Sequence, residues 1–383
     1  MKAIRPIPLR APRRRRVFAA ADTAVSVLGW GEALPAYRYR QDQLAEHLAA
    51  ALPPAQGRRL KAAFRGSRLE TRHSVLPDFA AGADARLFRG GSPSTAARMV
   101  VFAEEAPGLG EAAARAALAD AGTDPARITH LLFATCTGFA APGPDRDLIV
   151  RLGLSPTVRR VQIGYQGCSA GIVALRTAAE IVRGEPSARV LAVAVELASL
   201  HFQTEPGEDD LRGHALFADG AGAAVVGAAA GRASTRGEGT GAARVLVQRG
   251  ASQLLPGSAD DMRWDVGDAG FLMHLSAHVP EALATELPAF AARLSLDTRD
   301  GIRHWAIHPG GPVILDRVRD ALGIPEERLA PSRDVLRTCG NMSSATVFFV
   351  FRRIVAGGEP GDGVALAFGP GLTVEGLRFR VDA

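Results

Sequence analysis

Hydrophobic and polar positions follow two patterns along this chain: short apolar runs, and longer stretches with an apolar residue at every third or fourth position. Apolar runs of about four to eight residues predict buried strands, whereas the longer spacing predicts helices with one buried face. Strand-like runs occupy 17–31, 128–138, 188–195, 302–310 and 364–368, and helix-like spacing occupies 41–52, 57–64, 98–121 and 172–183. This alternation predicts an α/β protein with mixed sheets covered by helices.

The same pattern contains a long internal repeat. Ile128-Thr-His-Leu-Leu-Phe matches Ile302-Arg-His-Trp-Ala-Ile, and the helix and strand that follow Cys168 match the helix and strand that follow Asn341. Self-similarity over so long a distance indicates two duplicated halves rather than a solenoid of short repeats. We place the N-terminal half at 1–235 and the C-terminal half at 236–383, related by a pseudo-twofold axis that brings equivalent points together.

Three chemically capable residues occupy related positions in the two halves. Cys168 and Asn341 each stand at the start of a buried helix, in equivalent places. His308 stands at the end of the strand equivalent to the one that ends near Cys136. Because α/β proteins form their sites where strand ends meet helix starts, we expect these three side chains to converge.

Together they make a nucleophile, a base and an amide donor. A helix start can lower a cysteine pKa from about 8.5 to between ~3.5 and ~7.5, so a Cys168 thiolate beside His308 is expected to attack thioesters. His308 and Asn341 can both donate to one oxyanion, including the enolate left when a malonyl group loses carbon dioxide. A purely structural role would explain each of these three residues taken singly. The duplication makes it improbable that all three occupy related positions by coincidence.

Two other nucleophile motifs compete with this interpretation. Gly167-Cys-Ser-Ala-Gly171 matches G-x-S-x-G, which would make Ser169 a hydrolase nucleophile. A hydrolase would not account for the duplicated half or for Asn341. A papain-like protease would place Cys168 in a Cys-Gly-Ser-Cys-Trp context, which is missing.

The composition limits the class of protein but does not identify a ligand. The 383 residues are 47% hydrophobic and 22% charged, which suits an enzyme with a large core. A net charge of +5 suggests anionic ligands, but no nucleic-acid motif accompanies it. The three cysteines form no disulfide framework, and neither Cys nor His spacing suggests a metal site.

The N-terminal region superficially resembles a secretion signal. Arg13 to Arg16 precede an apolar run that reaches Trp30, but Asp22 interrupts it and no convincing cleavage site follows. No stretch offers the roughly 18 uninterrupted apolar residues of a membrane span. We therefore expect a cytoplasmic protein without a membrane span.

The motifs resemble those of thiolase-fold condensing enzymes, and among them the type III polyketide synthases of the chalcone synthase superfamily. The matching segments are Tyr165-Gln-Gly-Cys-Ser-Ala-Gly171, Leu216-Phe-Ala-Asp-Gly-Ala-Gly222, His308-Pro-Gly-Gly-Pro312, Gly340-Asn-Met-Ser-Ser344 and Phe368-Gly-Pro-Gly371. The resemblance runs from about Val25 to the end and implies a thiolase fold with duplicated αβαβα layered halves. The last segment separates this family from ketoacyl-carrier-protein synthase III relatives, which share the Cys-His-Asn triad.

The resemblance implies a reaction and its participants. A starter acyl-CoA would acylate Cys168, and His308 with Asn341 would then drive malonyl-CoA decarboxylation. Repeated condensation would give a poly-β-keto thioester that cyclises in the same cavity, with no organic cofactor and no metal. It further implies a homodimer, with an acyl carrier protein as a second candidate donor of the starter.

The resemblance also assigns substrate-binding residues. Phe217 would be the gatekeeper between the CoA tunnel and the cavity. The other implied substrate-binding residues are Cys136, Thr137, Ala141, Ala198, His201, Trp264, Met273, Gly310, Ser343, Phe368, Gly369, Pro370 and Gly371. Arg59 and Lys61 fall roughly where the family places residues that meet CoA phosphates, although a solvated helix face explains them equally well.

Departures from the plant enzymes point to the starter. Met273 replaces a gatekeeper phenylalanine, Trp264 replaces a cavity glycine, and Cys136, Ala198 and His201 replace cavity threonines. Ala141 replaces a methionine contributed across the dimer. Small Ala198 and Ala141 leave room for an apolar chain while Trp264 blocks one wall, and the segments 135–143 and 195–201 resemble bacterial alkylresorcinol and alkylpyrone synthases.

We therefore expect a fatty acyl starter that becomes an alkylpyrone or alkylresorcinol. The runner-up is a ketoacyl synthase III-like enzyme that performs a single condensation. A non-catalytic scaffold would keep the fold and lose the triad, but Cys168, His308 and Asn341 are all present.

Overall fold

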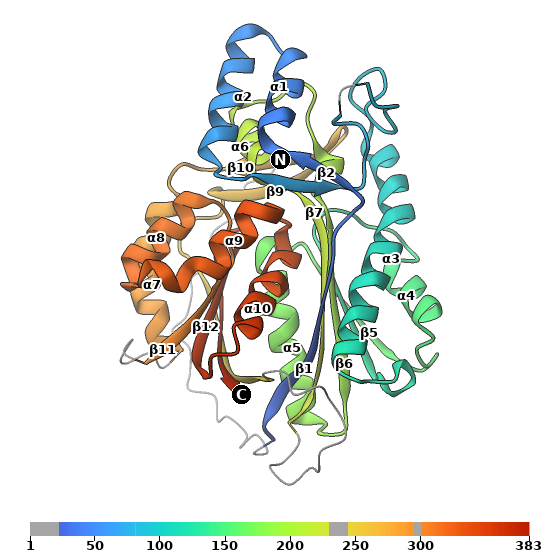
Figure 1. Ribbon diagram of the computed structural model, residues 1–383, viewed down its shortest axis with the longest axis vertical. Coiled ribbons are helices and arrows are strands. Elements are labelled where there is room, and N and C mark those ends of the chain that lie inside the picture. The colour runs from blue at the N-terminus through green and yellow to red at the C-terminus, as the bar shows by residue number, and fades with distance from the viewer. Residues whose placement is uncertain (1–22, 81, 230–243, 295–300, 383) are drawn as a thin grey trace, which may run out of the picture.

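A nine-stranded sheet runs through the computed structural model, which describes residues 23–80, 82–229, 244–294 and 301–382 (Figure 1). Its strand order is β11-β12-β13-β8-β1-β7-β6-β4-β5. The strands are β1 (Val25–Ala33), β4 (His130–Thr135), β5 (Arg159–Gly164), β6 (Arg189–Leu197), β7 (Asp219–Ala228), β8 (Arg244–Leu254), β11 (Ile302–Ile307), β12 (Gly361–Gly369) and β13 (Thr373–Asp382). Two short antiparallel sheets of two strands pair β2 (Tyr37–Arg40) with β3 (Thr71–Ser74), and β9 (Met262–Gly267) with β10 (Gly270–Leu275).

The large sheet consists of two equivalent parts joined edge to edge by β1 and β8. Outward from β1, the strands β7, β6 and β4 pair antiparallel, antiparallel and parallel. Outward from β8, the strands β13, β12 and β11 repeat this order of directions. The predicted duplication is therefore confirmed, and the two predicted sheets are continuous with each other. The predicted boundary at residue 235 lies outside the described residues.

Helices form three layers around the two parts of the sheet (Figure 1). The equivalent helices α5 (Ala170–Gly184) and α10 (Thr346–Ala356) lie between the two parts and contact strands of both. Their apolar faces, with residues such as Leu175 and Phe348, join one buried core with both parts of the sheet. The outer layers are α3 (Thr95–Asp120) with α4 (Pro144–Leu152), and α7 (Val279–Arg293) with α8 (Pro312–Leu322). The resulting order of layers is α-β-α-β-α.

The remaining helices gather at one end of these layers, beside the two short sheets (Figure 1). They are α1 (Gln41–Ala50), α2 (Pro54–Gly66) and α6 (Glu208–Leu216), while α9 (Ala330–Cys339) leads from α8 toward α10. Within the described ranges, no helix combines the length and the apolarity that a membrane crossing needs.

The contact between α5 and α10 depends on a glycine. A Cβ atom on Gly171 would lie 2.3 Å from the Ser344 carbonyl oxygen and 2.7 Å from Val347 Cγ1. We expect Gly171→Ala to lower the free energy of unfolding by about 2 kcal/mol, because the two helices would have to separate. Thermal denaturation tests this, with Gly184→Ala on the same helix as the control, since no atom lies within 4 Å of a Cβ there. Equal melting temperatures for the two variants would contradict the expectation.

Candidate active site

A cavity of about 340 Å³ opens where residues from both halves meet. Its lining is mostly apolar and runs from the ends of α2 and α8 inward to the start of α5. The predicted site residues that line it are Cys136, Thr137, Cys168, Ala198, Phe217, Trp264, Met273, His308, Gly310, Asn341, Ser343, Phe368 and Pro370. The structure thus brings the predicted triad and most of the predicted substrate-binding residues into one space.

Cys168 sits in a 3₁₀ turn, Gly167–Ser169, directly before α5. Gly167 has a φ of 55° and its Cα faces Pro370, where a Cβ would lie 2.6 Å from the Pro370 Cδ. Gly369 and Gly371 do not line the cavity, but Gly369 lies so close to Ser169 that a Cβ would come within 2.5 Å of its hydroxyl. Gly167 and Gly369, which lack a Cβ, thus let the end of β12 and the loop after it pack against the turn that holds Cys168. Ser169 itself donates to the Gln166 carbonyl at 2.7 Å and does not line the cavity.

Asn341 presents its amide nitrogen to the cavity. Its Oδ1 accepts a hydrogen bond from the Ser343 backbone N–H at 2.9 Å, which fixes the orientation of the amide. Its Nδ2 then lies 3.5 Å from the Gly310 carbonyl oxygen and 4.0 Å from the Cys168 sulfur. An N–H donor is therefore held beside the predicted nucleophile.

His308 follows β11, where its backbone N–H donates to the Leu366 carbonyl at 2.8 Å. Its side chain is 1% exposed, and neither ring nitrogen has a hydrogen-bond partner among the described residues. A buried imidazole without partners has lost its hydrogen bonds to water and gained none in the protein, which costs free energy. An oxygen-bearing ligand in the cavity would supply the missing partner.

The charge states differ from those expected from the sequence. Burial raises the pKa of Cys168 to about 11, with a partly offsetting hydrogen bond from Ser343 and a further rise from the Glu196 carboxylate. Burial also lowers the pKa of His308 to about 3. Burial therefore disfavours the charged form of each group, and desolvation opposes the field of the helix start. This burial opposes the thiolate–imidazolium pair expected from the sequence.

This difference predicts how Cys168 reacts with an alkylating agent. With a pKa of about 11, its thiolate fraction and its rate of carbamidomethylation should rise about tenfold per pH unit between pH 7 and 10. A pKa in the range expected from the helix start would instead give a plateau above neutral pH. Peptide mass spectrometry measures the rate at Cys168 separately from the buried Cys136 and Cys339. A plateau would contradict the raised pKa.

The backbone around Asn341 is anchored to the N-terminal half. Its N–H donates to the Leu216 carbonyl and its carbonyl accepts from the Ala218 N–H, each at 2.9 Å. Asn341 and Phe217 therefore pair as in a parallel ladder. The predicted gatekeeper and the predicted amide donor are fixed relative to each other by main-chain bonds.

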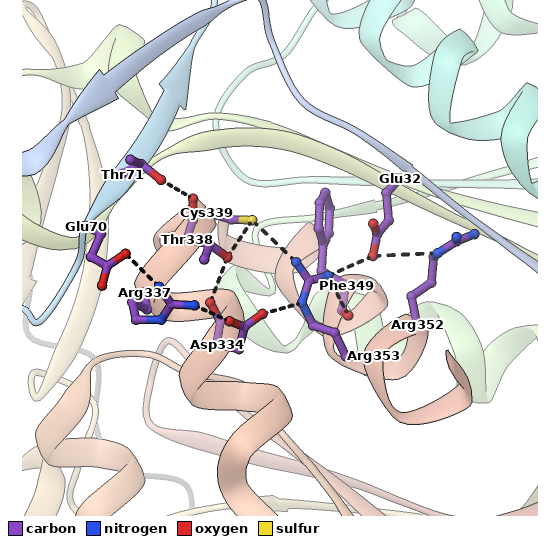
Figure 2. Close-up of polar contacts among 10 residues, drawn as sticks. All are labelled: Glu32, Glu70, Thr71, Asp334, Arg337, Thr338, Cys339, Phe349, Arg352 and Arg353. Carbon is purple, nitrogen blue, oxygen red and sulfur yellow. Dashed lines mark hydrogen bonds and ion pairs between the residues drawn. The ribbon is translucent and has the colours of Figure 1, made fainter. Parts of the chain in front are cut away.

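A charged network ties the helices on either side of Asn341 to the N-terminal half (Figure 2). Arg337 on α9 pairs with Glu70 at 2.6 Å, next to the β3 residue Thr71. Arg353 on α10 lies between Asp334 at 3.0 Å and the β1 residue Glu32 at 3.3 Å (Figure 2). Sequence reasoning missed this network because Glu70 and Glu32 lie hundreds of residues from the arginines that they pair with.

Glu196 is a second feature that sequence reasoning missed. This fully buried carboxylate ends β6 and accepts hydrogen bonds from Thr137 Oγ1 at 2.7 Å, from the Cys136 N–H at 3.1 Å and from the Ser344 hydroxyl. It joins the loop after β4 to the turn before α10. A glutamate at the end of an otherwise apolar strand was the available signal.

Trp264 forms part of the cavity wall. Its indole N–H donates to the Cys136 carbonyl at 2.8 Å, and its ring lies against Phe217 and His201 at centroid distances of 6.1 Å and 5.6 Å. His201 lies behind this wall rather than in the cavity. Its Nε2 bonds to the Thr137 carbonyl at 2.7 Å and its Nδ1 accepts from the Phe271 N–H at 3.0 Å.

Other predicted residues lie away from the cavity. Ala141 is exposed on the loop before α4, so its predicted contribution to a partner's cavity stays a prediction. Arg59 is exposed on α2, and Lys61 pairs with Glu46. Neither lines the cavity, so their role toward CoA also stays a prediction.

The cavity mouth carries cationic side chains that the sequence did not single out. Arg212 and Arg263 line it, and each forms ion pairs with aspartates, as between Arg263 and Asp265 at 3.0 Å. Among the described residues, no cluster of three or more His, Cys, Asp or Glu could hold a metal ion.

Comparison with known families decides the affiliation of the chain. Residues 12–230 match the family model for the N-terminal domain of chalcone and stilbene synthases, and residues 246–382 match the model for the C-terminal domain. The chain belongs to the chalcone and stilbene synthase family. It is therefore a type III polyketide synthase, an acyltransferase that catalyses decarboxylative condensation from acyl-CoA and malonyl-CoA.

Individual relatives extend over nearly the whole polyketide synthase. It is 34% identical to the alpha-pyrone synthesis polyketide synthase-like Pks18 of Mycobacterium tuberculosis, over 98% of this chain and 97% of that protein. It is also 34% identical to type III polyketide synthase 21 of Oryza sativa subsp. japonica, over 92% and 93%. The crystal structure of PKS-I from the brown alga Ectocarpus siliculosus matches with a TM-score of 0.86 and 30% identity, covering 95% of this chain and all of that one. The predicted thiolase fold is thereby confirmed.

Proposed function

We propose that this polyketide synthase loads a fatty acyl-CoA starter on Cys168, extends it with malonyl-CoA, and cyclises the product to an alkylpyrone or alkylresorcinol. The observation that carries the proposal is the mostly apolar cavity of about 340 Å³ with Cys168, His308 and Asn341 in its wall. An apolar pocket favours burial of an alkyl chain. The relative named for alpha-pyrone synthesis gives independent support.

Loading of the starter begins with a neutral pair. As the Cys168 sulfur attacks the thioester carbonyl, its proton passes to His308, and the imidazolium returns that proton to the departing CoA thiolate. The need for this transfer follows from the pKa values, about 11 for Cys168 and about 3 for His308. Cys168 then carries the acyl group as a thioester.

Extension uses the two donors that remain. When malonyl-CoA loses carbon dioxide, negative charge develops on its thioester oxygen, where His308 and the Asn341 Nδ2 donate hydrogen bonds. The enolate carbon attacks the acyl carbonyl on Cys168, and the Cys168 sulfur leaves as the new carbon–carbon bond forms. The released Cys168 thiolate takes up a proton from solvent, and the extended chain, now on CoA, returns to Cys168 by the same loading step. These steps call for no metal and no organic cofactor, because His308 and Asn341 supply the hydrogen bonds to the enolate and Cys168 carries the acyl group.

Cavity shape accounts for the proposed choice of starter. Ala198, Phe217 and Met273 line the cavity, and the small Ala198 side chain takes up little of its volume. Trp264, held by its bond to the Cys136 carbonyl, forms part of the same wall. We therefore propose that the fatty acyl starter is of medium length.

A homodimer is part of the same proposal. Strand β5 is the outer edge of the sheet, and most of its residues are exposed, including Val161 at 41%. An exposed edge strand can pair with a second copy. The exposed Ala141 loop lies on the connection between β4 and α4, where a partner could meet it. Delivery of the starter by an acyl carrier protein remains a second proposed route.

Product analysis tests the proposal. Purified protein is incubated with malonyl-CoA and acyl-CoAs of increasing chain length, and products are identified by mass spectrometry. We expect pyrones or resorcinols that retain the alkyl chain, with the highest kcat/KM for medium-length fatty starters. Turnover of only short or aromatic starters would overturn the fatty acyl assignment, and a single β-ketoacyl product would overturn repeated extension.

A further inference from the structure

A second, smaller cavity of about 60 Å³ lies behind the inner wall of the active-site cavity. The two cavities share four lining residues: Ala198, Phe217, Trp264 and Met273. The two cavities are therefore neighbours across these side chains. A chain bound at Cys168 would reach the second cavity by displacing one of them, of which Met273 is the most flexible.

His214 on α6 lines this second cavity and has an unused donor. Its Nε2 accepts a hydrogen bond from the Gln203 backbone N–H at 3.0 Å, so the proton of the neutral ring resides on Nδ1. Among the described residues that line the cavity, Nδ1 is the buried side-chain nitrogen or oxygen that lacks a partner. The ring is held in place by stacking on Phe202 at a centroid distance of 4.1 Å.

The other polar groups of this wall are engaged. The Arg72 guanidinium donates to Gln41 Oε1 and to three main-chain carbonyls of the 214–217 segment. The Tyr39 hydroxyl donates to the Leu76 carbonyl at 2.6 Å. Asp210 accepts from the Gly207 N–H at 2.9 Å, and His201 uses both ring nitrogens. One donor, His214 Nδ1–H, is thus left without a partner on a residue that lines this small cavity.

We propose that this second cavity binds an oxygen atom, hydroxyl or keto, carried on the far part of the acyl chain, with His214 Nδ1–H as its donor. The inference rests on the proposed function and narrows the starter from a plain fatty acyl group to one oxygenated at a fixed distance from Cys168. His214 thereby becomes a specificity-determining residue.

Size and charge favour an oxygen at the end of a chain. By the volume that a water molecule needs, about 60 Å³ accommodates on the order of four water-sized atoms, which suits a chain end rather than a ring. Burial and the nearby cations Arg72 and Arg98 lower the pKa of His214 to about 3, so the ring stays a neutral donor. An N–H group without a partner favours an acceptor oxygen over a further donor.

Matched starters test the proposal. Acyl-CoAs of six to fourteen carbons, each with and without a hydroxyl on the penultimate carbon, are compared by kcat/KM for product formation with malonyl-CoA. We expect the oxygenated member to be preferred about tenfold at one chain length, because the donor lies at a fixed distance from Cys168. The preference should vanish in His214→Phe, whose ring can keep the stacking on Phe202 but carries no N–H donor. His47→Gln, on α1 and lining neither cavity, should keep it.

The outcomes separate this inference from the proposed function. Equal use of both members at every length, with polyketides formed, would overturn the second binding site and leave water as its occupant. An oxygen preference that survives in His214→Phe would also overturn it. No polyketide from any starter would instead overturn the proposed function. The comparison within the wild-type protein needs no variant, so it stands even if His214→Phe fails to fold.

Discussion

Replacing Cys168 with alanine should abolish polyketide formation and leave malonyl-CoA decarboxylation in place. The sulfur is the proposed acyl acceptor, so its removal should lower the condensation rate by about a thousandfold or more. Decarboxylation needs only the donors on His308 and Asn341, and neither depends on Cys168 for its position. Asn341 is fixed by the Ser343 N–H at 2.9 Å, and His308 by its backbone bond to Leu366.

Two chromatographic readouts separate the half-reactions: acetyl-CoA formed from malonyl-CoA alone, and polyketide formed when a starter is added. Ser169→Ala is the matched control, because Ser169 neighbours Cys168 but bonds to the Gln166 carbonyl outside the cavity. It should retain both activities. Product formation by Cys168→Ala, or its loss in Ser169→Ala alone, would move the nucleophile to Ser169.

The internal repeat made the architecture predictable. Because duplicated sequences fold alike, the equivalence of Cys168 with Asn341 and of the strand before Cys136 with the strand before His308 predicted two duplicated α/β halves and one shared site. The five layers followed from the resemblance of the motifs to thiolase-fold enzymes. The residue types in the motifs and their places in the repeat were sufficient to predict which residues share the site. Each residue lies at the start of a helix or the end of a strand, positions that the repeat itself defines.

Long-range environment could not be predicted in the same way. The pKa of Cys168 depends on how completely side chains from both halves exclude water, and a helix start visible in the sequence carries no information about that. The same limit applies to Glu196, whose partners come from the loop after β4 and the turn before α10. Arg212 and Arg263 reach the cavity mouth from segments that carry no motif.

Asn341 offers the complementary test, because its replacement should impair both half-reactions. The Asn341→Asp variant keeps an oxygen to accept from the Ser343 N–H, so the local backbone bond is retained. It replaces the Nδ2 donor with a negatively charged oxygen. That oxygen would face the position where His308 and Nδ2 are proposed to hold the enolate, 4.0 Å from the Cys168 sulfur.

We expect Asn341→Asp to lower malonyl-CoA decarboxylation by about 10²–10³-fold, the usual effect of losing one oxyanion donor, and condensation by at least as much. Gln43→Glu, exposed on α1, adds the same charge away from both cavities and should leave both rates unchanged. Thermal denaturation shows whether the variant is folded. Decarboxylation within tenfold of wild type would show that His308 alone stabilises the enolate. Loss of decarboxylation here, together with its survival in Cys168→Ala, would assign the acyl carrier and the enolate donor to separate residues.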